Sequence, residues 1–184
     1  IALKGSKAKV TDVNESLGYT EWTLKNGVKV VVRPSALKAD EVQIVAIAKG
    51  GKSMLSIEES LQADYLAMVM QQSGIGNFSA TELAKQLSGK SAFATVGVGA
   101  YEHSISAGGS PKDIETILQL IYLNFTAPRF DQTDLDNLKR MYVPYFSNMA
   151  SDPNYIMAKQ SSSTLYKNNP RRQVSSVADI EALS

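Results

Sequence analysis

Asp64 and Met68 are the first pair of residues in this sequence whose types and spacing bear on chemistry. They lie in the stretch QADYLAMVM (62–70), which is apolar apart from Gln62 and Asp64. On a helix, side chains four residues apart are stacked neighbours, and two helical histidines at this spacing can hold one zinc ion. A thioether is a poor zinc ligand beside imidazole or carboxylate. Asp64 therefore marks a site, the remnant of a site, or the edge of a helix's buried face.

Histidine and cysteine counts limit the possible chemistry further. The chain has one histidine, His103, and no cysteine, whereas a catalytic zinc site takes three protein ligands that usually include imidazoles. We expect His103, beside Glu102, to be an ordinary surface or structural residue. The sequence holds no G-x-S-x-G, no Walker loop and no G-x-G-x-x-G before a helix. Gly97-Val98-Gly99 lies in strand-like sequence, which indicates a bulge or the close approach of another backbone.

Composition indicates a folded chain of one domain, or one large unit of a longer protein. Of its 184 residues 43% are hydrophobic, enough for a sizeable core, and the formal net charge is +1. No basic stripe is present, so nucleic acid is not expected as a partner. No apolar run reaches 18 residues, so no membrane span is expected. The lack of cysteine excludes disulfides and leaves the compartment open.

The first fifty residues predict strands. Apolar residues alternate around Asn26-Gly27, a pair typical of a type I′ hairpin turn. Residues 41–49 predict a third strand that Gly50-Gly51 ends, and residues 91–108 predict two more with a break near 99–101. We expect the polar stretch 1–18 to be a linker into one domain, 19–184.

Helix start signals follow in a consistent series. Capping boxes at Ser56/Glu59 and Ser79/Glu82 predict the first two helices. Further starts are expected at Ser110-Pro111, Asp131, Asp152-Pro153 and Ser176, with a kink or split at Pro144 of the long helix that Asp131 begins. Spacing on these helices predicts that Met68, Met70, Tyr122 and Phe125 are core residues. Separate runs of strands and helices indicate an α+β fold, a mostly antiparallel sheet with helices layered on it.

An ordered set of motifs over residues 19–184 resembles the insulinase/pitrilysin family of zinc peptidases. The set comprises Leu24-Lys25-Asn26-Gly27 running into VKVVV, then AKGG, SATELAKQL, FTAPRFD and Asp152-Pro153. The stretches SGIGNFSATELAKQLSGK and LQLIYLNFTAPRFD are most similar to the non-catalytic second halves of two-half bacterial members. The resemblance implies the insulinase/mitochondrial-processing-peptidase-like metallohydrolase fold.

The family's active-site phrase, A-H-F-L-E-H-M, lies against Ala63–Val69. Asp64 stands at the first ligand histidine, Ala67 at the general-base glutamate and Met68 at the second ligand histidine. The third ligand in active members is a glutamate of the later long helix, but no glutamate lies between Glu115 and Glu181, and Val143, Tyr145 and Phe146 stand around the expected place. We therefore expect neither catalytic residues nor a metal site in this chain, with Asp64 at the rim of a degenerate site.

The resemblance implies a clamshell in which two homologous halves enclose a peptide chamber. This chain would be the first domain of the non-catalytic half, forming chamber wall and interface, while zinc lies in a catalytic half of the same chain or a partner subunit. The strand 91–99 matches the strand that receives peptide in catalytic domains, which makes Phe93, Ala94 and Thr95 candidate peptide contacts. Relatives with this pattern imply a bacterial protein and an extracytoplasmic, periplasmic location.

Two other functions remain open at this point. One is a stand-alone structural or assembly protein built on the degenerate peptidase fold. The other is a hydrolase with a different metal site at Asp64. We also expect the chain to be a C-terminally truncated fragment that self-associates through an exposed sheet edge.

Overall fold

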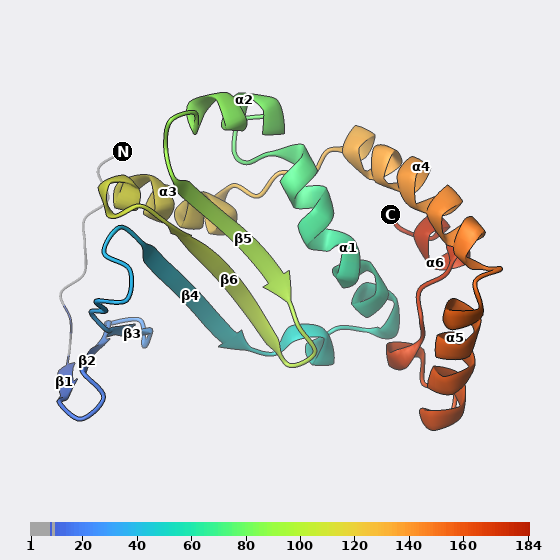
Figure 1. Ribbon diagram of the computed structural model, residues 1–184, viewed down its shortest axis with the longest axis horizontal. Helices are drawn as coiled ribbons and strands as arrows, with labels where there is room; N and C mark the ends of the chain where they lie inside the picture. The colour runs from blue at the N-terminus through green and yellow to red at the C-terminus, as the bar shows by residue number, and fades with distance from the viewer. Residues whose placement is uncertain (1–7, 9) are drawn as a thin grey trace. The chain divides into compact units, whose positions relative to one another are not determined.

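The computed structural model describes residue 8 and residues 10–184 of the chain. The chain divides into two compact units, Ile1–Asp40 and Glu41–Ser184. Strands pair in antiparallel sheets and helices fill most of the second unit (Figure 1). The α+β class expected from the order of strand and helix signals is confirmed.

The first unit holds an antiparallel three-stranded sheet in the order β1-β2-β3. Its strands are β1 (Val10–Asn14), β2 (Tyr19–Thr23) and β3 (Lys29–Val32). Trp22 of β2 lies opposite Val30 of β3. Strand β1 lies inside the stretch 1–18 that we expected to be a linker. The sequence did not predict this strand because VTDVN is too polar and too short to indicate a strand by itself. Residues 1–7 and 9 of that stretch lie outside the described residues.

The hairpin between β2 and β3 is confirmed, but the predicted type I′ turn is wrong. A type I′ turn needs positive φ at both Asn26 and Gly27, and only Gly27 has it, at φ 87°. The N–H of Gly27 donates to Leu24 O (3.0 Å), and the N–H of Leu24 donates to Val28 O (2.8 Å). This pattern is a type I turn followed by a left-handed glycine that forms a bulge.

The second unit is built on a sheet in the order β4-β6-β5. Strands β4 (Val42–Lys49), β6 (Glu102–Gly109) and β5 (Ala92–Val98) are antiparallel, which confirms the break predicted within 91–108. Helix α3 (Ile114–Thr126) follows the short 3-10 turn η2 (Pro111–Asp113) and packs on one face of this sheet. Ile117 of α3 is fully buried against Ile105 and Ala107 of β6.

The other helices begin where the sequence predicts. They are α1 (Ile57–Ser73), α2 (Ala80–Gln86), α4 (Gln132–Met149), α5 (Pro153–Leu165) and α6 (Val177–Glu181), with the 3-10 turns η1 (Gly51–Met54) and η3 (Pro170–Arg172). Ser56, Ser79, Asp131, Asp152 and Ser176 are their N-caps. Pro144 lies inside α4, which continues to Met149, so the predicted split does not occur.

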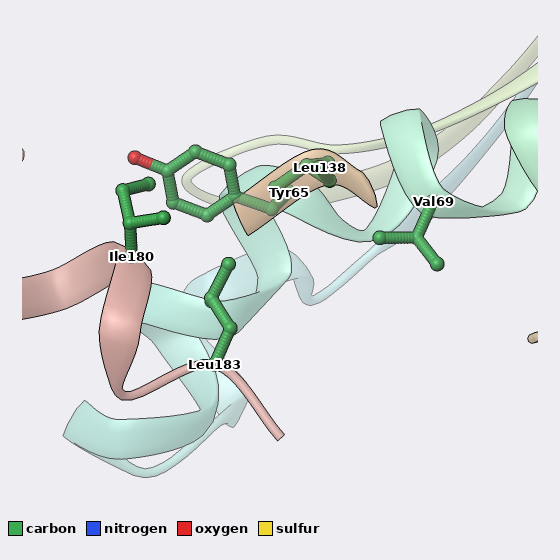
Figure 2. Packing of buried hydrophobic residues seen from close by; sticks show 5 residues of the cluster. All are labelled: Tyr65, Val69, Leu138, Ile180 and Leu183. Atoms are coloured by element: carbon green, nitrogen blue, oxygen red, sulfur yellow. The ribbon is translucent and has the colours of Figure 1, made fainter. Parts of the chain in front are cut away.

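A second core fixes α1 against α4 and α6. Tyr65 and Val69 of α1 pack with Leu138 of α4 and with Ile180 and Leu183 (Figure 2). Leu138 and Ile180 have no exposed surface, and full burial of such side chains stabilises a fold by about 1.5–3 kcal/mol each. In Figure 1, α1 lies between the β4-β6-β5 sheet and the group α4, α5 and α6.

Exposure corrects part of the predicted core. Met70 is buried, whereas Met68, Tyr122 and Phe125 are exposed. Their helical spacing is that of an apolar face, but for Tyr122 and Phe125 the face points away from the sheet. Within the described residues, no helix is both long enough and apolar enough to cross a membrane.

Candidate functional site

Helix α1 carries Asp64, Ala67 and Met68, the three positions that the sequence alignment sets against the zinc-peptidase motif. Its start is fixed by a capping box, in which Ser56 Oγ accepts from the N–H of Glu59 (3.2 Å) and Glu59 Oε2 accepts from the N–H of Ser56 (2.8 Å). Hydrogen bonds from the backbone N–H of Ser56 and, to a smaller extent, from its side chain to the ionised carboxylate lower the pKa of Glu59. Because Tyr65 and Val69 face the core, Asp64 and Met68 lie on the exposed face of α1.

Asp64 is paired with a lysine. Lys52 Nζ donates to Asp64 Oδ1 at 2.5 Å, and the two side chains are 25% and 44% exposed respectively. Lys52 belongs to η1, and its own N–H donates to Gly99 O in the β5–β6 turn (2.9 Å). The carboxylate at the first ligand position is therefore bound to an ammonium group held by the sheet.

Met68 is paired with a tyrosine of α4. Tyr142 Oη donates to Met68 Sδ at 3.3 Å. The Tyr142 ring also contacts Tyr65, Tyr145 and Phe146, with ring centroids 6.2, 6.0 and 6.1 Å away. The sequence places Val143, Tyr145 and Phe146 around the third ligand position, but the side chain that reaches Met68 is that of Tyr142.

Ala67 faces a small cavity beside β5. The cavity has a volume of about 180 Å³, and its lining includes Ala67 and the three predicted peptide-contact residues Phe93, Ala94 and Thr95. Within the described part of the chain, β5 pairs with β6 on one side only, and α1 also contacts it. The structure thus brings the general-base position and the candidate peptide strand together.

A larger cavity lies on another face of α1. It measures about 550 Å³ and is lined by residues that include Gln62, Leu66, Phe130 and Leu135. Leu66 is two residues from both Asp64 and Met68, which puts it on roughly the opposite side of the helix. This cavity is therefore separate from the zinc-motif positions.

The donors at the motif positions do not fit a zinc ion. Asp64 is bound to Lys52, Ala67 has no donor atom, and Met68 offers a thioether that already accepts from Tyr142. Across residue 8 and residues 10–184, no three His, Cys, Asp or Glu residues are grouped so as to hold a metal ion. His103 is an exposed residue of β6, where it lies opposite Ala48 and Val98.

The close backbone approach expected around 97–99 is confirmed at Gly99. Its carbonyl oxygen accepts from the N–H of Lys52, and a Cβ built on Gly51 would lie 2.4 Å from that oxygen. Gly51 itself is buried, and its backbone has φ 60°, in the left-handed region. Sequence reasoning missed Lys52 and Tyr142, because a contact across 12 or 74 residues leaves no local pattern.

Solved structures with the same fold include proteases and an inactive peptidase domain. The periplasmic protease PqqL from Escherichia coli superposes with a TM-score of 0.82 at 19% identity, over 98% of this chain and 20% of its own. The peptidase M16 inactive domain from Pseudomonas fluorescens superposes with a TM-score of 0.64 at 16% identity, over 90% of this chain and 42% of its own. The chain has the fold of a peptidase M16 domain. The resemblance to the insulinase/pitrilysin peptidases is confirmed at the level of the fold.

The M16 fold also occurs in a structure with a protein substrate. The ferredoxin protease FusC, solved in complex with Arabidopsis ferredoxin, superposes with a TM-score of 0.73 at 16% identity. The match covers 100% of this chain and 20% of FusC, so this chain spans about one-fifth of FusC and of PqqL. No protein-family model and no curated protein matches the sequence.

Proposed function

We propose that this chain is a non-catalytic domain of a bacterial zinc metallopeptidase. The observation that carries the proposal is an M16 fold whose two ligand positions and base position hold Asp64, Met68 and Ala67. Zinc and the H-x-x-E-H motif would lie in a catalytic half of the same polypeptide or in a partner subunit. The activity of that enzyme would be hydrolysis of peptide bonds.

Within such an enzyme, β5 would form part of the wall of the peptide chamber. An extended peptide can add to the edge of a sheet through main-chain hydrogen bonds, whatever its sequence. Phe93 is half-exposed beside the 180 Å³ cavity, where it can contact a substrate side chain. In the complete enzyme, Phe93→Ser should raise KM for a peptide substrate and leave kcat unchanged, whereas Met54→Ser, at another exposed apolar residue, should alter neither.

The outer face of α3 is our candidate for the interface with the catalytic half. Ile114, Leu118, Tyr122 and Phe125 are 37–69% exposed and follow one side of the helix, whose only charged residue is Glu115. Contiguous exposed apolar surface of this kind marks protein–protein contacts. A Leu118→Ser/Phe125→Ser double variant should weaken association with the catalytic half, and Leu165→Ser on α5 (74% exposed) serves as the matched control.

Metal content and peptide cleavage test the non-catalytic role directly. The purified chain is incubated with zinc, desalted, and assayed for bound metal and for hydrolysis of a mixed peptide library. We expect neither stoichiometric zinc nor hydrolysis, and finding both would overturn the proposal. The same result would favour a hydrolase that uses a different metal site at Asp64, and in that case Asp64→Ala should abolish the activity.

A stand-alone assembly protein on the same fold is the second candidate. It is favoured if no H-x-x-E-H sequence occurs in the same polypeptide or in a neighbouring gene. A periplasmic location is part of the proposal because PqqL, which shares the fold, is a periplasmic protease. Cell fractionation with an antibody to this chain tests that location.

A further inference from the structure

We propose that Lys52 and Tyr142 close the vacated ligand positions, so that the site excludes metal ions and instead fastens α1 to the sheet and to α4. The Lys52 ammonium places a positive charge beside the Asp64 carboxylate, where a metal ion would otherwise bind. The Tyr142 hydroxyl donates a hydrogen bond to the Met68 sulfur. The comparison with a metal site rests on the proposed function. The two contacts themselves do not depend on it.

The backbone of Lys52 is held from two sides. Arg171 of η3 donates through Nη1 to Lys52 O (2.6 Å) and through Nη2 to Leu55 O (2.5 Å). Three main-chain hydrogen bonds tie η1 to the β5–β6 turn: Gly50 N to Tyr101 O (2.8 Å), Lys52 N to Gly99 O (2.9 Å) and Ser53 N to Ala100 O (2.9 Å). The backbone of Lys52 is therefore fixed before its side chain pairs with Asp64, so less conformational entropy is lost when the pair forms.

A metal ion at Asp64 would have to displace this ammonium or lie beside it. Like charges about 4 Å apart repel in any dielectric environment that a protein offers, and a divalent ion doubles the effect. The Lys52 side chain is only 25% exposed, so it has limited room to move away. A zinc site built around Asp64 should therefore be weak while Lys52 is present.

The decisive test gives zinc two histidines and leaves Asp64 in place. Met68→His and Tyr142→His are introduced together because Tyr142 already reaches Met68, which makes three ligands with Asp64. Zinc affinity is measured by calorimetry, and Co²⁺ absorption reports the geometry. Adding Lys52→Met should tighten zinc binding by about tenfold or more, which is the effect of a 1.4 kcal/mol change.

Lys90→Met is the matched control in this background. Lys90 Nζ donates to Thr116 Oγ1, on other elements, so its removal should leave zinc affinity unchanged. Equal zinc affinity with and without Lys52 would overturn the proposal. That result would leave the non-catalytic function standing, because the metal content of the natural chain tests the function separately.

A double-mutant cycle on the natural site covers the case in which neither histidine variant binds zinc. Lys52→Met, Asp64→Asn and the pair of changes are compared by urea unfolding. The two effects should be non-additive by about twofold or more in the unfolding equilibrium constant, as for a partly exposed ion pair. Strict additivity would show that Lys52 does not hold Asp64 and would overturn the proposal.

Discussion

Gly51→Ala should be far more destabilising than a glycine substitution usually is. Gly51 has φ 60° and is buried, and a Cβ there would lie 2.4 Å from both Glu102 N and Gly99 O. These are backbone atoms, so no side-chain rotation relieves the clash. Gly89→Ala is the matched control, because Gly89 has φ 78° with nothing within 4 Å of a built Cβ.

Both substitutions place alanine in left-handed backbone, at a cost of about 1–2 kcal/mol. At Gly51 the clash must also move η1 away from the β5–β6 turn, which breaks the three main-chain hydrogen bonds between them. Each such bond contributes about 0.5–1.5 kcal/mol, so the further loss is about 1.5–4.5 kcal/mol. We expect Gly51→Ala to lower the free energy of unfolding by about 2.5–6.5 kcal/mol in all.

Equilibrium unfolding in urea, followed by far-ultraviolet circular dichroism, measures both variants. The midpoint should fall strongly for Gly51→Ala and slightly for Gly89→Ala, with the slope unchanged. If the two variants agree within about 0.5 kcal/mol, the close approach of η1 to the turn does not stabilise the fold, and the reasoning is refuted.

Further predictions concern the core, two helix caps and the sheet edge. Leu138→Ala should lower the free energy of unfolding in urea by about 2–5 kcal/mol, because Leu138 of α4 is fully buried against α1 and α6. A loss below about 1 kcal/mol, closer to that of a surface substitution, would contradict that packing. Hydrogen bonds to their caps lower the pKa of Glu59 and Glu82, so the stability each adds is present above the ordinary pKa of 4.5 and lost as pH falls through the lowered value. Glu59→Gln should therefore flatten the pH dependence of urea unfolding as the pH falls from 4.5 through the lowered pKa, and an unchanged pH profile would count against the cap. Strand β4 pairs only with β6 within the described residues, so we expect the isolated chain to self-associate on concentration; a monomer at high concentration by light scattering would argue against an exposed edge.

Local signals in the sequence predicted most of the helices. Ser56, Ser79 and Asp152 cap their helices as expected, because a cap depends on residues two or three positions away. Strand β1 escaped prediction because its residues are polar, and a strand of this kind is stabilised by pairing with β2 rather than by its own pattern.

The helix that carries the candidate positions was predictable from the sequence, and the contacts of those positions were not. Alignment with a family phrase placed Asp64, Ala67 and Met68 on one helix, and the structure places Ala67 beside β5. Lys52 and Tyr142 reach the site from other elements, so their contacts depend on how those elements pack. Packing is a property of the whole fold, which is why no spacing rule revealed them.

The position of Trp22 makes the two compact units spectroscopically distinct. Trp22 is the only tryptophan in the chain, and it lies on β2 of the first unit. Tryptophan fluorescence therefore reports on the small hairpin sheet, while helical circular dichroism reports on the second unit, which contains all the helices of the described residues. Unfolding curves that coincide for the two signals would mean that the units melt as one cooperative body, and separate curves would resolve the stability of each.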